Sequence, residues 1–195
     1  MGARMFTAIV PPPDVVAAVD DFLQPRRDAD NRLAWTRTES WHVTTAFMAD
    51  VPSRNLERLE ESLSDAAART DPFELRLGGG GSFPYVAAAR TLWFGVTHGR
   101  SEVSALATRC RNAADRAGIP VDGAKFFPHL TVARTRQPFN ATKWIGILDT
   151  FEEASWQATE LQLIESHLHD KGHRYETIAT FPLGGIAGKT ATTAA

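Results

Sequence analysis

Two copies of one short pattern, His-x-Thr, constrain this chain more than any other feature of its sequence. The first copy, His42 and Thr44, lies in residues 41–47, and the second, His129 and Thr131, lies in residues 127–134. Both copies sit in short apolar runs rich in β-branched residues, a composition typical of β-strands. Because side chains alternate between the two faces of a strand, the histidine and the threonine of each copy point to the same face. Two such strands facing one cleft would bring two imidazoles and two hydroxyls together.

This set of side chains suits displacement at phosphorus. One neutral imidazole can take a proton from water while a second, protonated imidazole gives a proton to a leaving oxygen. The threonine hydroxyls can donate hydrogen bonds to the non-bridging phosphate oxygens. The scheme requires no metal and no cofactor. A strand with one polar face explains a single copy equally well, but two copies with matching flanks favour a shared catalytic site.

With these motifs in view, the sequence resembles the two-histidine (2H) phosphoesterases, and specifically the RNA 2′,3′-cyclic phosphodiesterases, also called LigT-type 2′-5′ RNA ligases. The resemblance covers about residues 4–183. Three features depart from it: Trp41 and Thr45 stand where leucines are usual, and Gly78–Gly81 replaces a shorter loop. The residues that carry the resemblance outside the first motif are the opening run 4–13, Trp35, residues 127–134, residues 166–168, Gly172, Tyr175 and the closing Phe181, Pro182 and Leu183.

The resemblance implies a role for each motif residue. The reaction would be hydrolysis of the 2′,3′-cyclic phosphate on the terminal ribose of an RNA to a 2′-phosphomonoester. His42 would be the general acid that protonates the departing 3′ oxygen, and His129 the general base that activates water. In the reverse direction the two histidines could exchange roles and join RNA ends through a 2′-5′ bond. Thr44 and Thr131 would hold the phosphate oxygens, with Arg134 assisting as a phosphate clamp. From the residues alone, either histidine could be the acid or the base. For Arg134 the alternative is a surface ion pair, because strict alternation along the strand would turn its side chain away from the cleft.

The pattern of apolar residues predicts an α+β fold. Each half of the chain contributes one motif strand, further short strands and helices, which is a rough internal duplication. We expect bilobal, duplicated antiparallel sheets with helices packed outside and a central cleft that carries the two motifs, as the resemblance also implies. Residues 1–183 would form one two-lobed domain, and residues 184–195, with almost no bulky apolar side chain, a disordered tail. The expected strands, besides the motif strands, are 5–10, 73–77, 91–96, 160–165 and 175–181, and the expected helices are 14–23, one opening at 52–53, and 101–117.

The composition of the chain limits which binding partners and which cellular compartment we expect. The 195 residues carry a net charge of −2, so no broad basic surface is expected, and an RNA substrate would be held at its end by local contacts. The single cysteine, Cys110, excludes an internal disulfide and fits a reducing compartment, as a buried structural thiol rather than a nucleophile. No stretch approaches the ~20 apolar residues that span a bilayer, and no secretory signal is evident. We therefore expect a cytoplasmic monomer without membrane contact.

Three further groups of residues invite a functional interpretation. Phe6 and Trp35 are candidates for stacking on a terminal base, with core packing as the alternative. His167, His169, Asp170 and His173 resemble a metal site superficially, but a solvated hairpin tip explains them better. Gly78–Gly81 lacks the Lys-Ser/Thr of a phosphate-binding loop, so a flexible connection is favoured over a phosphate cradle.

Two other functions remain open for the same motif residues. The substrate could be a small cyclic nucleotide, a cyclic ADP-ribose phosphate or a 2′-5′ linked oligonucleotide rather than an RNA end. The chain could also be a module that binds RNA ends without turnover, although the intact set of two histidines and two threonines argues against it.

Overall fold

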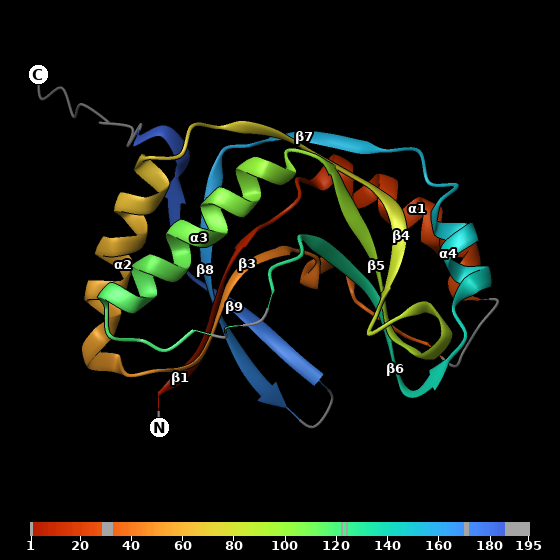
Figure 1. The fold of residues 1–195 in the computed structure, drawn as a ribbon, viewed down its shortest axis with the longest axis horizontal. Helices are drawn as coiled ribbons and strands as arrows, with labels where there is room; N and C mark the ends of the chain where they lie inside the picture. The colour runs from red at the N-terminus through yellow and green to blue at the C-terminus, as the bar shows by residue number, and fades with distance from the viewer. Residues whose placement is uncertain (1, 29–32, 122, 124, 170–171, 186–195) are drawn as a thin grey trace, which may run out of the picture.

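One curved antiparallel sheet dominates the computed structural model, which describes residues 2–28, 33–121, 123, 125–169 and 172–185 (Figure 1). The strand order is β7-β4-β5-β6-β3-β1-β8-β9, and β2 pairs with β6 beside this path. The strands are β1 Ala3–Ile9, β2 Ala34–Trp35, β3 Val43–Val51, β4 Phe73–Phe83, β5 Ala89–His98, β6 His129–Phe139, β7 Ala154–Ala158, β8 Glu160–His169 and β9 Gly172–Pro182. The helices are α1 Pro13–Arg27, α2 Ser53–Ala68, α3 Arg100–Arg116 and α4 Thr142–Leu148.

The sheet divides into two four-stranded halves that meet at β3 and β6. Strands β3, β1, β8 and β9 form the half that we call the His42 lobe, and β6, β5, β4 and β7 form the His129 lobe. A single residue pair, Val43 opposite Leu130, joins the two halves. Helices α2 and α3 lie together at the His42 lobe, and α1 and α4 lie at the His129 lobe (Figure 1). The expected α+β architecture with two related lobes and outer helices is confirmed.

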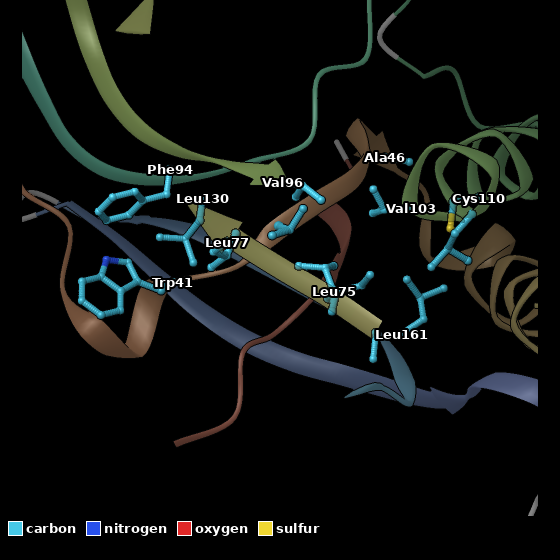
Figure 2. Close-up of a cluster of buried hydrophobic side chains, with 14 of the residues drawn as sticks. Trp41, Ala46, Leu75, Leu77, Phe94, Val96, Val103, Cys110, Leu130 and Leu161 are labelled. Atoms are coloured by element: carbon cyan, nitrogen blue, oxygen red, sulfur yellow. The ribbon is translucent and has the colours of Figure 1, made fainter. Parts of the chain in front are cut away.

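A continuous apolar core runs beneath the junction of the lobes. It includes Trp41 and Leu130 from the motif regions, Phe94 from β5 and Cys110 from α3 (Figure 2). Trp41 is only 2% exposed, so the departure from leucine at this position fills the core. Burying side chains of this size stabilises the fold by about 1.5–3 kcal/mol each relative to leaving them exposed.

Thr45, a second departure from the family pattern, forms a short chain of hydrogen bonds inside the core. Its hydroxyl lies 2.7 Å from the Thr7 hydroxyl and donates to the Cys110 sulfur over 3.6 Å. Burial raises the pKa of the Cys110 thiol to about 11. The thiol is therefore a buried structural group, as expected from its place on the apolar side of α3.

The glycine run Gly78–Gly81 is part of β4, so the expectation of a flexible connection is wrong. Gly80 faces α4, where an added Cβ would lie 2.5 Å from the Leu148 Cβ, and its N–H donates to the Asp149 carboxylate over 2.7 Å. An added Cβ at Gly81 would lie 1.9 Å from the Trp93 indole on the neighbouring strand. The glycines thus allow a helix and an aromatic ring to approach the strand closely from its two faces.

Several element ends differ from the expected ones. Helix α1 continues through Pro25 to Arg27 instead of ending at Leu23, because Arg27 forms an ion pair with Asp20 at 2.6 Å and the Arg26 guanidinium stacks on Phe22 at 3.8 Å. Helix α1 begins at Pro13, one residue before the expected start at 14, and its N-cap is Pro12. Helix α3 begins at Arg100, one residue before the expected start at 101, and its N-cap is Gly99 with φ +78°.

Three elements were not anticipated: the two-residue strand β2, helix α4 and strand β7. Helix α4 spans only seven residues, which is too short for a helical period to show in the sequence. Strand β7 pairs with β4 at the edge of the sheet.

The described structure continues two residues past the expected end of the domain at residue 183. Leu183 and Gly184 donate backbone hydrogen bonds to the Thr159 and Thr70 carbonyls, each over 2.8 Å. The remainder of the expected tail, residues 186–195, lies outside the described residues. Among the helices of the described residues, none is long and apolar enough to span a membrane.

Candidate active site

A pocket of about 100 Å³ opens where the two lobes meet, on the face of the sheet opposite the core. It contains the five residues that the motifs and the resemblance pointed to. Two more of its residues come from the segment before β3, and one comes from β9. The lining residues are Thr36, Ser40, His42, Thr44, His129, Thr131, Arg134 and Tyr175.

The strand junction explains why the two motifs meet. Val43 and Leu130 pair across the lobes, and each directly follows its motif histidine in the sequence. Both are fully buried, so the alternation of side chains turns the residues on either side of them toward the pocket. One residue pair therefore positions both histidines and both threonines.

Each imidazole is held in the same way. The Nδ1 atom of His42 lies 2.8 Å from the carbonyl oxygen of Ser40, and the Nδ1 atom of His129 lies 2.7 Å from that of Phe127. A carbonyl oxygen can only accept, so Nδ1 carries the hydrogen in both rings. The Nε2 atom of each neutral ring is then the one left to accept or return a proton.

Arg134 reaches the pocket because strand β6 contains a β-bulge. Leu92 of β5 pairs with Ala133 but Trp93 pairs with Thr131, so Val132 is an extra residue on β6. Val132 and Ala133 are both buried, and the bulge shifts the alternation by one residue. Arg134 consequently faces the same side as Thr131, although strict alternation would turn it away.

The first motif strand contains the matching bulge. Thr7 and Ala8 of β1 pair with Ala46 and Thr44, so Thr45 is the extra residue on β3. The position that corresponds to Arg134 is therefore Phe47, whose ring lies under the Arg4 guanidinium at 4.6 Å. The duplication includes the bend of each strand as well as the motif, but only the second copy directs an arginine into the pocket.

Aromatic rings surround both histidines. The Phe6 ring stacks on His42 with 4.6 Å between ring centroids, and the Tyr175 ring meets His42 edge-on at 5.4 Å. His129 meets Phe83 edge-on at 4.9 Å. These contacts restrict the orientation of each imidazole and remove water from one side of it.

Burial and charge lower the pKa of both histidines. Burial lowers the pKa of His42 from 6.5 to about 4, and the positive charges of His129 and Arg134 act in the same direction. Burial also lowers the pKa of His129, again with a contribution from the charge of Arg134. Both rings are thus mainly neutral at pH 7. A bound phosphate brings negative charge, which favours the protonated form of a nearby imidazole.

Phe6 and Trp35, the candidates for base stacking, do not line the pocket. Phe6 is 4% exposed, and one face of its ring is covered by His42. Trp35 pairs with Ala133, so it points to the core side of the sheet, where its ring meets Trp144 edge-on at 5.4 Å. Phe6 is buried and Trp35 is partly buried against the core, so packing accounts for both rings.

Three pocket residues had not been predicted as site residues. Thr36 and Ser40 come from the segment between β2 and β3, and Tyr175 comes from β9, which is far away in sequence. Thr36 is held by a 2.9 Å hydrogen bond from its N–H to the carbonyl of Val132, the bulge residue. No pattern in the sequence shows that these segments meet, although Tyr175 belongs to the residues that carry the family resemblance.

The expected histidine cluster at the β8–β9 hairpin is only partly within the described residues. His167 lies 3.6 Å from the Glu165 carboxylate and 3.3 Å from that of Glu176. Asp170 and the side chains of His169 and His173 lie outside the described residues. In the described part of the chain, no group of three or more histidine, cysteine and acidic side chains is arranged to hold a metal ion.

Comparisons with known proteins agree with the fold and with the motifs. The family model of the 2′-5′ RNA ligase superfamily matches residues 11–170. An RNA 2′,3′-cyclic phosphodiesterase from Geobacillus stearothermophilus is 34% identical over 172 residues, which cover 84% of this chain and 53% of that protein. The chain thus spans about half the length of that relative.

A second relative matches over nearly its full length. An RNA 2′,3′-cyclic phosphodiesterase from Methanothermobacter thermautotrophicus is 30% identical over 173 residues, which cover 87% of this chain and 91% of that protein. Among solved structures, TT0787 of Thermus thermophilus has a similar fold, with a TM-score of 0.75, 23% sequence identity, and coverage of 94% of this chain and 99% of that one. The chain belongs to the 2′-5′ RNA ligase superfamily, and its resemblance to the LigT-type two-histidine phosphoesterases is confirmed.

Proposed function

We propose that this protein hydrolyses the 2′,3′-cyclic phosphate at the end of an RNA to a 2′-phosphomonoester, without a metal ion. The observation that carries the proposal is the single pocket into which both His-x-Thr motifs point, each imidazole held through Nδ1. The relatives named RNA 2′,3′-cyclic phosphodiesterase support the same activity. The enzyme class is that of a phosphoric diester hydrolase acting on RNA or nucleotide ends.

The two imidazoles divide the proton transfers. Nε2 of His129 takes a proton from water, whose oxygen attacks phosphorus. The bond from phosphorus to the 3′ oxygen breaks, and His42 in its protonated form gives a proton to that oxygen. The bond to the 2′ oxygen stays, so the product is a 2′-phosphomonoester. The assignment of His42 as acid and His129 as base follows the family, because the hydrogen bonds of the two rings are equivalent.

The remaining pocket residues suit the phosphate. Thr44 and Thr131 can donate to its non-bridging oxygens, and the Arg134 guanidinium can pair with their negative charge. The pocket volume of about 100 Å³ is roughly three times the ~30 Å³ share of one water molecule. It can therefore hold a phosphate group, whereas the nucleoside must lie outside it.

Product analysis tests the proposal. The purified protein is incubated with an RNA oligonucleotide that ends in a 2′,3′-cyclic phosphate, and separately with a 2′,3′-cyclic mononucleotide, with and without EDTA. We expect a 2′-phosphate product from the RNA in both conditions. Activity on the mononucleotide alone would favour a small-molecule substrate instead, and loss of activity in EDTA would contradict the mechanism.

Substitution of the two histidines separates catalysis from binding. We expect His42→Ala and His129→Ala each to lower kcat by about 10²–10⁴-fold, the usual contribution of a general acid or base. The melting temperature should change little, because both rings border a pocket rather than the core. If wild-type protein binds the RNA end but forms no product over long incubation, the chain is an RNA-end binding module and the catalytic proposal is wrong.

We also propose that residues 1–183 act as one two-lobed domain, as a monomer in the cytoplasm, with the RNA end as partner and no membrane contact. The core shared by both lobes supports a single domain. The buried Cys110 thiol is consistent with a reducing compartment. Size-exclusion chromatography with light scattering measures the oligomeric state, and a dimer at micromolar concentration would contradict the monomer.

A further inference from the structure

The charges of this chain are unevenly distributed along it. Residues 75–101 and 123–148, which include most of β4 and all of β5, β6 and α4, carry seven of the 21 lysines and arginines and none of the 23 aspartates and glutamates. The net charge of −2 is therefore the sum of a basic part in the His129 lobe and an acidic remainder. A low net charge makes a broad basic surface unlikely to form, but it leaves room for a local one.

Three of these cations gather at the end of the His129 lobe where β6 finishes. The guanidinium of Arg90 donates to the carbonyl of Arg136 over 2.9 Å, which joins the start of β5 to the last half of β6. The short 3₁₀ helix Val86–Ala88 precedes β5, and its first carbonyl accepts a hydrogen bond from the N–H of Ala141 over 2.8 Å. This bond ties the turn to the start of α4, where Lys143 lies (Figure 1).

An exposed aromatic ring lies at the same end of the lobe. Tyr85 is 62% exposed and its neighbour Val86 is 40% exposed, and among the described residues no other large apolar side chain is exposed in this way. An aromatic ring that stays in water does little for the core, whereas it offers a flat surface on which a base can stack. We call Tyr85, Arg90, Arg136 and Lys143 the distal strip.

The cations of the distal strip are exposed and are not neutralised by carboxylates. Among the ion pairs that the described residues form with one another, none involves Arg90, Arg136 or Lys143. Arg69 and Arg76, in contrast, each pair with at least one carboxylate. The charge of the distal strip is therefore available to an anionic partner.

The distal strip continues from the pocket. Arg134 lines the pocket, is itself exposed, and lies on β6 two residues before Arg136. Its partner on the neighbouring strand is Thr91, which directly follows Arg90. Positive charge thus leads from the phosphate site to the end of the lobe.

The pocket of about 100 Å³ holds the phosphate group, so the rest of an RNA substrate lies on the surface outside it. Proteins bind single strands irrespective of sequence where basic side chains meet phosphates and aromatic rings stack on bases. We propose that the distal strip binds the RNA strand that leads to the cyclic end, through backbone phosphates and one stacked base, so that the enzyme prefers oligonucleotides to mononucleotides. This inference rests on the proposed function and specifies the substrate class of the same site.

Two substrates separate the distal strip from the phosphate site. Adenosine 2′,3′-cyclic phosphate occupies the pocket and its rim, whereas an octaadenylate with the same cyclic end also extends over the lobe. The test variants are the double substitution Arg136→Gln with Lys143→Gln, and the single substitution Tyr85→Ser. Arg90 is left in place because its guanidinium also holds the backbone of β6.

Each test variant has a matched control. Arg54→Gln with Arg58→Gln removes two exposed charges from α2, which covers the core side of the other lobe. Tyr85→Phe keeps the ring and removes only its hydroxyl. Melting temperatures should match the wild type in all four variants, since every substituted side chain is exposed.

We expect the Arg136 and Lys143 double variant to lower kcat/KM for the octanucleotide about tenfold, mainly through KM. The slope of log kcat/KM against log salt concentration should become less negative by about 1.4, because each phosphate contact on a single strand contributes about −0.7. Tyr85→Ser should lower kcat/KM for the octanucleotide about five- to tenfold without changing this slope. Hydrolysis of the mononucleotide should stay within about twofold in both test variants, and the controls should leave both reactions unchanged.

The outcomes distinguish this inference from the proposed function. A wild-type protein that does not hydrolyse the octanucleotide contradicts the proposed function, and the inference falls with it. A wild-type protein with equal kcat/KM on both substrates overturns the distal strip alone, and so do equal losses on both substrates or an equal loss in the α2 control. Unchanged octanucleotide kinetics in the test variants would also overturn it, and would leave an acidic protein as the partner that this surface fits.

Discussion

The carbonyl groups of Ser40 and Phe127 do more than hold two rings in place. Each accepts from an imidazole Nδ1, so each fixes the tautomer in which Nε2 faces the substrate. Burial then makes the neutral form of both rings dominant. A general base in this state is ready to act, whereas a general acid must first be protonated, which the negative charge of the substrate favours.

The pH dependence follows from these two pKa values. The active free enzyme needs a protonated His42 and a neutral His129, and the singly protonated forms together are most populated between the two macroscopic pKa values. The pKa of His42 is about 4, and that of His129 is lowered from 6.5, so we expect a bell-shaped profile of kcat/KM with its maximum below pH 6.5. Activity should fall as the pH rises, because the second proton carrier is lost.

The profile of kcat should lie at higher pH, since bound phosphate raises both pKa values. Initial rates for a 2′,3′-cyclic mononucleotide between pH 3.5 and 9 measure both profiles. A maximum of kcat/KM above pH 7 would show that the imidazoles of the free enzyme are not the proton carriers proposed for them.

At the scale of single elements, irregular strands build the site. The bulge at Val132 turns Arg134 into the pocket, and the bulge at Thr45 repeats the bend in the first motif strand. Strand β4 accommodates four consecutive glycines because a helix and an indole occupy the space of the missing side chains. A regular strand with the same residues would turn Arg134 away from the pocket.

Gly81 offers a test of this packing. In Gly81→Ala the new Cβ would lie 1.9 Å from a ring carbon of Trp93, so the indole must move. We expect a loss of stability of about 1–3 kcal/mol, as for other overpacked sites. Urea unfolding measures this effect.

Gly146 is the matched control, because an added Cβ there has no atom within 4 Å. Gly146 lies in α4, so Gly146→Ala should leave activity unchanged and raise stability by up to about 1 kcal/mol. A Gly81→Ala variant as stable and as active as wild type would mean that the indole is not constrained by the glycine.

In the whole molecule, the two halves of the chain are interleaved. Helix α1 follows β1 of the His42 lobe but packs on the His129 lobe, where Phe22 meets Phe94 and Phe151. Helix α3 follows β5 of the His129 lobe but packs beside α2 against β3. Each lobe is covered by a helix from the other half, so the lobes share one core, and the pocket between them is held by both.

Leu130 lies at the centre of this arrangement, between His129 and Thr131 and opposite Val43. Leu130→Ala should cost about 2–5 kcal/mol of stability, as for other buried leucines, and should also lower kcat because it loosens both motif strands. Leu161 is equally buried but lies on β8, so Leu161→Ala should cost similar stability with kcat nearly unchanged. Denaturant unfolding and kcat are measured for both, and equal kcat losses would argue against a special role of the junction.

The sequence by itself determined the chemistry and most of the elements. Two His-x-Thr copies in β-branched runs were enough to predict the motif strands and the shared face of each pair, because strand alternation is a local property. The apolar pattern along the chain, together with the family resemblance, predicted the two-lobed α+β plan. The sequence did not determine the bulges, the pocket position of Arg134, the inclusion of Tyr175, or the packing of Phe6 and Trp35 against the core. These depend on which strands pair and in which register, a property of contacts between distant residues that only the tertiary structure decides.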